Sequence, residues 1–234
     1  MSEITLTGWD VLDAARAMLR AAIAAVPAGG WQQATPCSQW DVTRVLQHAA
    51  LDQQAWGAAL AGTPGPGENP FAPSGQLDSG PLAYADHALE ASVVPWTAIG
   101  SAGAVPTPLP QGEMTPGDAA AAAALDAAIH AWDIAVATGQ GSPLTPELAG
   151  ALLPVARNIV EPLRAYGAYA PALEAGDGAL DDAVLLCYLG RRPDWTAGIS
   201  GDGDDRGSFT TRRGVVKDPR SLVGVAGESC GAVG

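Results

Sequence analysis

An alanine-rich run between residues 119 and 137 places the tightest limit on how this chain can fold. Thr115, Pro116 and Asp118 precede it in the order of a helix start, which is a capping residue, a proline at N1 and an acid at N3. Gly139 follows the run and is suited to end the helix. Because these side chains are small, we predict that another helix, or a ligand, approaches this helix closely.

Start and stop signals divide the rest of the chain into further helices. Thr7 with Asp10, and Ser38 with Asp41, each place a capping residue three positions before an acid. Apolar residues then recur at helical spacing, and almost nothing alternates as a strand would. We therefore predict an all-α fold with four main antiparallel helices and short additional helices. The expected helices cover roughly residues 7–26, 38–60, 81–99, 115–139, 145–162 and 181–189, with long loops at 62–80 and 100–114.

The chain changes character after Trp195. Residues 198–234 are rich in glycine, aspartate and arginine, and their short apolar stretches show no sustained period. We predict that residues 1–197 form the helical domain and that residues 198–234 form a disordered tail.

Charge and composition restrict the partners that this chain could have. The net charge is −13, and so acidic a surface repels nucleic-acid phosphates and anionic lipid heads. Residues 1–7 lack the basic and apolar pattern of a signal peptide, and no apolar run reaches the length of a membrane span without breakers. We expect a cytoplasmic protein that binds neither nucleic acid nor a membrane.

The chain has three histidines, and two of them lie on helix faces where a ligand could bind. His48 falls on or beside the buried stripe of its helix, and His130 falls in the alanine-rich helix. Asp126 and Asp133 stand four before and three after His130, so they share its face. A carboxylate buried in a helical core is costly unless a cation or metal pairs with it. His48, Asp126 and His130 therefore predict a divalent-metal site with an open position, suited to zinc or to nickel, iron or manganese.

Simpler interpretations of the same residues stay open. His48 and His130 could be core histidines that hydrogen-bond to the backbone. Asp126 or Asp133 could orient a neutral His130 or face solvent. His87 lies near acidic residues on its own helix, and we expect it at the surface.

Three segments together resemble a known family. They are TPCSQWDV at 35–42 leading to His48, HAWDIAVATGQ at 130–140, and LGRRPDW at 189–195. They are similar to the DinB-like superfamily of four-helix bundles. Within it they resemble the actinobacterial branch related to the metal-binding domain of mycothiol-dependent maleylpyruvate isomerase. The resemblance covers roughly residues 8–195.

The resemblance implies a DinB-like four-helix bundle with its own metal ligands. In that family the metal is held by a histidine late in the second helix, by an acid or histidine further along the chain, and by a final histidine four residues after it. Carried over by position, these ligands are His48, Asp126 and His130. The isomerase has glutamate as the middle ligand. Aspartate is one methylene shorter, so the metal must sit nearer this helix or a water must intervene.

The resemblance also implies a chemistry, which is a metal-bound thiolate. A low-molecular-weight thiol, mycothiol above all, binds at the open position, where the cation lowers the thiol pKa. The thiolate then adds to a small electrophile in an S-transfer or a cis–trans isomerisation. We expect Trp40, Trp132 and Asp133 to line the pocket. The alternative is a non-enzymatic metal- or ligand-binding bundle, acting as a homodimer, that has no catalytic turnover.

Overall fold

The computed structural model describes residues 6–197, so the predicted tail at 198–234 lies outside the described residues. The described chain contains six α-helices, one 3₁₀ turn and two short strands, which confirms the predicted all-α class. The helices are α1 (Asp10–Ala24), α2 (Val42–Ala61), α3 (Pro81–Ala98), α4 (Pro116–Ala137), α5 (Pro146–Ala165) and α6 (Asp181–Tyr188). The turn is η1 (Gly30–Gln32). The strands β1 (Val105–Pro106) and β2 (Glu113–Met114), which the sequence did not predict, pair antiparallel within the loop before α4.

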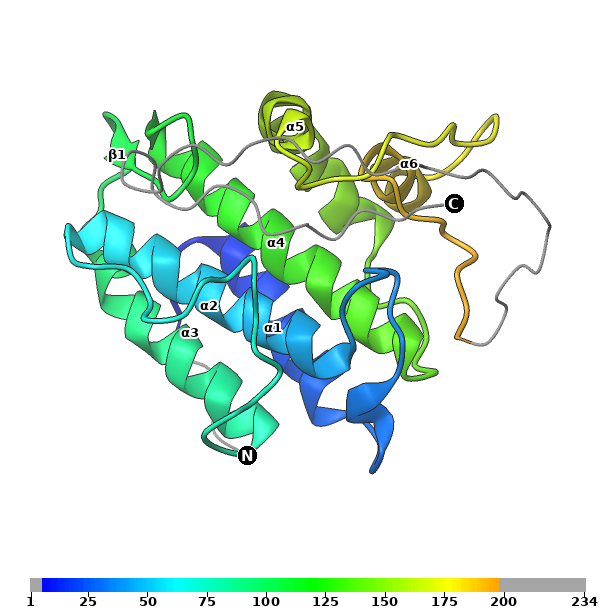
Figure 1. Ribbon diagram of the computed structural model, residues 1–234. Coiled ribbons are helices and arrows are strands. Elements are labelled where there is room, and N and C mark those ends of the chain that lie inside the picture. The colour runs from blue at the N-terminus through cyan, green and yellow to red at the C-terminus, as the bar shows by residue number, and fades with distance from the viewer. Residues whose placement is uncertain (1–5, 198–234) are drawn as a thin grey trace, which may run out of the picture.

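The alanine-rich helix α4 lies at the centre of the bundle (Figure 1). It packs against α1, α2 and α5, while α3 packs against α2 and α6 against α5. Its alanines from Ala122 to Ala137 are all buried, and those at 123, 124, 127, 128, 131 and 137 are completely so. Small side chains on several faces of one helix let its neighbours approach it closely, as the sequence predicted.

By length and composition alone, α4 could also cross a membrane, contrary to the expectation that no segment would qualify. Its mean hydropathy over the best window is 1.3, because its few polar residues are spread among many apolar ones. Of that window, 83% is buried inside the bundle. Buried core helices pass the same test, so the result is weak evidence for a membrane span.

The starts of α4 and α5 follow the predicted capping chemistry. Thr115 Oγ1 accepts a hydrogen bond from the Asp118 backbone N–H at 3.2 Å, with Pro116 at the first helical position. Thr145 Oγ1 accepts one from Leu148 in the same way at 3.3 Å. These side chains satisfy backbone donors that the first turn of a helix leaves unpaired.

The starts of α1 and α2 correct the sequence prediction. α1 has no side-chain cap, and Thr7 instead donates its backbone N–H and its hydroxyl to Asp13, at 2.8 and 2.7 Å. The capping residue of α2 is Asp41 and not Ser38. Asp41 accepts a hydrogen bond from the Arg44 backbone N–H at 2.9 Å. Residues 37–40 form a turn instead of a helical start, and this turn delays the helix.

Helix α5 runs farther than its prolines suggested. The sequence predicted an interruption near Pro162, but α5 continues through both Pro154 and Pro162 to Ala165. Both prolines are exposed. Water can therefore solvate the carbonyl groups that a proline leaves without a helical donor.

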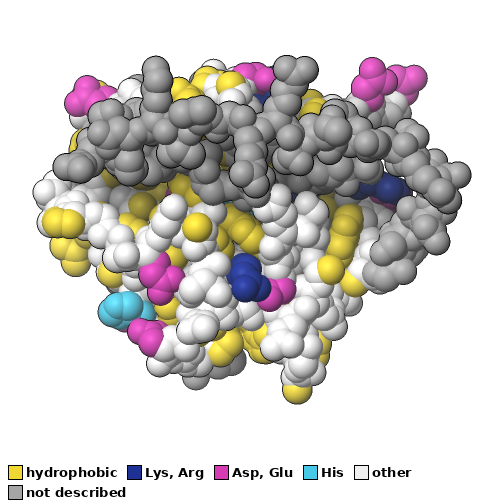
Figure 2. Space-filling view, in the orientation of Figure 1, with side chains coloured by type: hydrophobic (Ala, Val, Ile, Leu, Met, Phe, Trp, Pro, Cys, Tyr) yellow, Lys and Arg dark blue, Asp and Glu magenta, His cyan; other side chains and the backbone are white. Residues whose placement is uncertain are grey.

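The face seen in Figure 2 carries mostly uncharged side chains among its described residues, with a few acidic and basic ones scattered between them. Some arginines pair with acids, as Arg20 does with Asp86 at 2.7 Å. The acidic excess of the chain is therefore not gathered into one patch on this face.

The packing of α2 on α3 depends on Gly57. A Cβ added there would lie 2.9 Å from both Cα and Cβ of Ser92, too close for either backbone to remain in place. We expect Gly57→Ala to lower the free energy of unfolding by roughly 1–3 kcal/mol, although alanine is favoured over glycine in helices by about 1 kcal/mol. Urea unfolding measures the change. Gly117→Ala, with open space around its Cβ, is the matched control and should be neutral or stabilising; equal losses in both variants would contradict the close contact.

Candidate metal centre

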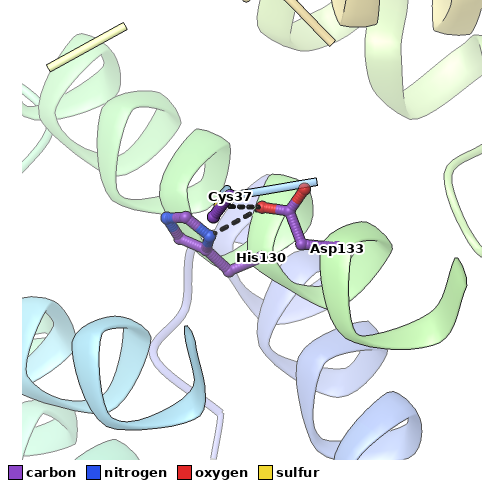
Figure 3. Close-up of side chains that lie close together, drawn as sticks. All are labelled: Cys37, His130 and Asp133. Carbon is purple, nitrogen blue, oxygen red and sulfur yellow. Dashed lines mark hydrogen bonds and ion pairs between the residues drawn. The ribbon is translucent and has the colours of Figure 1, made fainter. Parts of the chain in front are cut away.

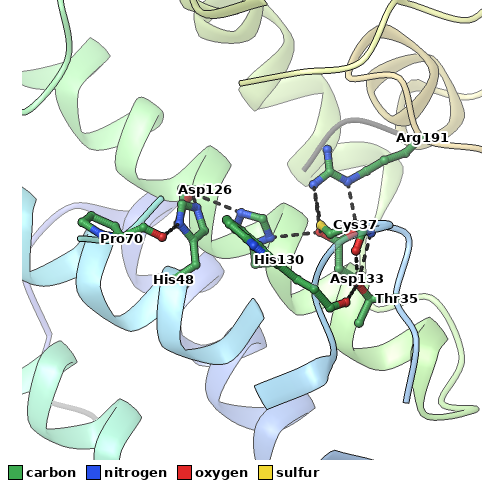
Figure 4. A network of polar contacts seen from close by, with 9 residues as sticks. Thr35, Cys37, His48, Pro70, Asp126, His130, Asp133 and Arg191 are labelled. Atoms are coloured by element: carbon green, nitrogen blue, oxygen red, sulfur yellow. Dashed lines mark hydrogen bonds and ion pairs between the residues drawn. The ribbon is translucent and has the colours of Figure 1, made fainter. Parts of the chain in front are cut away.

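Two imidazole rings from different helices meet inside the bundle. α2 carries His48 and α4 carries His130, and their ring centroids lie 4.7 Å apart at an angle of 86°. Nε2 of each ring lies 3.3 Å from Oδ1 of Asp126, which is one helical turn before His130 (Figure 4). The side chains of His48, His130 and Asp126 are 7%, 6% and 17% exposed. The structure thus brings together the three residues that the sequence singled out.

The other nitrogen of each ring is held by an acceptor. Nδ1 of His48 lies 2.8 Å from the carbonyl oxygen of Pro70, in the loop between α2 and α3. Nδ1 of His130 lies 2.9 Å from Oδ2 of Asp133. A carbonyl or carboxylate oxygen only accepts, so each Nδ1 carries the proton and donates. This leaves Nε2 of both rings directed at Asp126, in the arrangement that orients metal-binding histidines.

Asp133 orients His130 rather than lining the cavity. Asp133 is completely buried, and Arg191 donates hydrogen bonds to both of its oxygens. Arg191 Nε lies 2.9 Å from Asp133 Oδ1, and Arg191 Nη2 lies 2.8 Å from Asp133 Oδ2. Sγ of Cys37 lies 3.3 Å from Asp133 Oδ2 (Figure 3) and 3.7 Å from Arg191 Nη2. Arg191 is 58 residues from Asp133, and no sequence spacing indicated this pair.

The buried carboxylates make His130 a stronger base. Burial alone would lower the pKa of His130, but Asp126 and Asp133 outweigh burial and raise this pKa to about 9. Burial would raise the pKa of Asp126, because it disfavours the charged carboxylate, but His130 and His48 hold this pKa well below its usual value. The pKa of Asp133 is also lowered, because the charge of Arg191 and the hydrogen bond from His130 exceed the effect of burial. In the metal-free protein near neutral pH, His130 is therefore protonated and paired with these two carboxylates.

The two histidines form the polar end of a cavity of about 70 Å³, large enough for several water molecules. Trp40 lines it as predicted, with its ring centroid 4.8 Å from that of His48. Trp132 does not line the cavity. It lies two residues after His130 on α4, so its side chain points to a different side of the helix. Trp132 is instead completely buried in the core. The remaining apolar wall comes from Trp56, Phe71, Leu109, Ile159 and Leu163.

Asp52 is a cavity residue that the sequence reasoning missed. It lies one turn after His48 on α2 and lines the cavity with Asp126 and His130. Burial raises the pKa of Asp52 well above its usual value, and the negative charge of Asp126 raises it further. Its spacing of four residues from His48 was the available signal, the same signal that pointed from His130 to Asp126.

The three predicted ligands fit a divalent cation. Ligands about 2.0–2.1 Å from a tetrahedral zinc ion lie roughly 3.3 Å from one another, which matches both separations between Nε2 and Asp126 Oδ1. Oδ2 of Asp126 and Oδ2 of Asp52 are buried without a hydrogen-bond partner in the described chain, a cost that a nearby cation would relieve. Although aspartate is shorter than glutamate, Asp126 reaches both rings.

Cys37, His130 and Asp133 form a second group of possible ligands. In both groups the ligand atoms lie within 4.8 Å of one another. Arg191 already binds both oxygens of Asp133 there. A guanidinium beside the site opposes a second cation, so His48, Asp126 and His130 form the candidate centre.

Comparison with known proteins identifies the family of the chain. A family model described as the mycothiol maleylpyruvate isomerase N-terminal domain matches residues 12–135, more than half of the chain. The chain belongs to this family. The match includes His48, Asp126 and His130, together with α2 and nearly all of α4.

Two curated relatives from Mycobacterium tuberculosis, strains CDC 1551 / Oshkosh and ATCC 25618 / H37Rv, carry the description of uncharacterized proteins. Each is 34% identical to this chain over 129 residues. That stretch is 55% of this chain and spans 65% of each relative. No solved structure matches the chain.

Replacing the two histidines tests the ligand assignment. We expect the purified protein to hold a single divalent ion, and the double variant His48→Ala, His130→Ala to hold almost none, because two of three ligands are gone. Elemental analysis of both proteins measures this. His87→Ala removes the remaining histidine, which is exposed, and should keep its metal. Equal metal in the double variant would place the ion elsewhere.

The raised pKa of His130 predicts how metal binding would depend on pH. Below about pH 9 an incoming ion must displace a proton from His130, so affinity falls as the pH falls. We expect the affinity for Co²⁺, measured by competition with a chelator, to rise about tenfold per pH unit between pH 7 and 8.5. His130→Ala should bind weakly and lose this proton-linked part of the dependence. A constant affinity of the wild-type protein across that range would contradict the assignment.

Proposed function

We propose that this protein is a divalent-metal-dependent member of its family that uses a mycothiol-type thiol. Its reaction would be S-transfer to, or isomerisation of, a small electrophile. One observation carries the proposal. Two buried imidazoles present Nε2 to the same carboxylate oxygen at the end of a cavity, and each ring is oriented through Nδ1. Two histidines that only packed in the core would not need to direct both Nε2 atoms at one carboxylate oxygen.

Each residue of the centre has a distinct task in this proposal. His48, Asp126 and His130 would hold the ion, for which zinc is the first candidate and nickel, iron or manganese also suit. When bound, such an ion lowers the pKa of a coordinated thiol and so supplies a nucleophile near neutral pH. Asp133, fixed by Arg191, holds Nδ1 of His130 and so keeps Nε2 directed at the site.

The cavity walls support a small and largely apolar electrophile. The rings of Phe71 and Trp40 both lie near the ring of His48, with centroids 5.7 and 4.8 Å from it. Leu163 and Ile159 of α5 line the same space. Apolar walls exclude water from the polar end, which strengthens the electrostatic interactions there.

Membership of the family supports the choice of thiol, because the family description names a mycothiol maleylpyruvate isomerase. For the cell we propose a cytoplasmic location and small-molecule partners, a thiol and an electrophile, with neither nucleic acid nor membrane as partner. The net charge of −13 supports that part of the proposal.

A reaction with a fluorogenic electrophile tests the proposal. We expect metal-loaded protein to make mycothiol react with a bimane faster than the two react without protein. Protein stripped by a chelator should lose this acceleration, and adding back the ion should restore it. Calorimetric titration with mycothiol measures binding separately from turnover. Metal binding with no thiol affinity and no rate above background, across several electrophiles, would favour the non-enzymatic bundle instead.

A further inference from the structure

Gln47, the residue before His48, is completely buried and faces the long loop between α2 and α3. Its Nε2 donates to Glu68 Oε2 at 2.7 Å, to Ser74 Oγ at 3.1 Å and to the Gln76 carbonyl at 3.1 Å. Its Oε1 accepts from the Gly75 N–H at 2.7 Å. One side chain thus engages four residues of one loop with both ends of its amide.

This loop, residues 62–80, has little structure of its own. It is rich in glycine and proline and contains no helix or strand. Ordering so many residues costs conformational entropy, which contacts with the body of the protein must offset. In the described chain, Gln47 makes more hydrogen bonds to this loop than any other residue of α2 does. Arg44 Nη2 adds a weaker one to the Ser74 carbonyl at 3.4 Å, and His48 Nδ1 adds one to the Pro70 carbonyl.

The same loop supplies the partner that orients His48. The Pro70 carbonyl accepts from His48 Nδ1 at 2.8 Å (Figure 4), and the neighbouring Phe71 packs on the His48 ring and lines the cavity. Pro70 lies between Glu68 and Ser74, the two loop side chains that Gln47 holds. Consecutive helical residues point about 100° apart, so Gln47 can bind the loop while His48 faces α4.

We propose that Gln47 is a positioning residue for the metal centre. By holding residues 68–76 on α2, it keeps the Pro70 carbonyl against His48 Nδ1, and so keeps the proton on Nδ1 and the lone pair on Nε2. The proposal deepens the function proposed above and rests on it for its metal readout. The orientation of His48 can be measured without any metal.

Gln47→Met tests the proposal. Methionine keeps the length and apolar packing of the side chain, and it removes every hydrogen bond that the Gln47 side chain makes to the loop. The matched control is Gln53→Met. Gln53 lies on the same helix, is also completely buried, and donates to the Ala123 carbonyl of α4 at 3.1 Å rather than to the loop. Both variants should lose some stability, so a loss of stability alone does not distinguish them.

Two readouts distinguish a positioning role from a merely structural one. In the metal-free protein, NMR should show an Nδ1–H signal of His48 that exchanges slowly with water, assigned by its loss in His48→Ala. We expect Gln47→Met to lose that protection and Gln53→Met to keep it. Affinity for Zn²⁺, measured by competition with a chelator, should fall about 10- to 100-fold in Gln47→Met, the usual effect of removing support from a metal-binding histidine.

Equal metal affinity in the two methionine variants, with the His48 signal still protected in Gln47→Met, would overturn the proposal. If the wild-type protein binds no metal, the metal-centre proposal fails, but loss of protection in Gln47→Met alone still supports the positioning of His48 by Gln47. Circular dichroism and a cooperative melt in each variant establish that the bundle is intact.

Discussion

The close approach of α4 to α1 and α2 is the constraint on which the rest of this structure depends. A helix whose buried faces are mostly alanine lets its neighbours pack against it at short range. That approach brings His130 of α4 within 4.7 Å of His48 on α2, measured between ring centroids. Larger side chains at the alanine positions would separate the helices, and the two Nε2 atoms would no longer share one carboxylate oxygen.

Each imidazole is oriented from outside the centre, and the two orienting partners differ in kind. His48 depends on a neutral carbonyl in a loop, which Gln47 ties to the helix. His130 depends on a buried carboxylate, Asp133, whose charge Arg191 offsets. Both oxygens of Asp133 are bonded to one guanidinium, which fixes the orientation of this carboxylate. Asp126 and, to a smaller extent, Asp133 raise the pKa of His130. The orientation of both imidazoles is therefore set by segments outside the proposed metal centre.

The cavity joins this polar end to apolar walls drawn from α2, α4, α5 and the loop after α2. Two carboxylates, Asp52 and Asp126, line it beside the imidazoles, and each keeps one buried oxygen without a partner in the described chain. Such an arrangement is costly for a protein that merely fills its core, and it suits one that binds a cation.

The sequence by itself determined the helical class, most helix boundaries and the trio His48, Asp126 and His130. Capping residues and proline or glycine signals act locally, and a spacing of four residues fixes a shared helix face. It misplaced Trp132 and Asp133, and it missed Asp52, Arg191 and Gln47. Only the tertiary structure shows what these side chains contact, because the contacts join segments far apart in the chain. Local periodicity says which face a side chain occupies, but only the packing of helices and loops decides what that face meets.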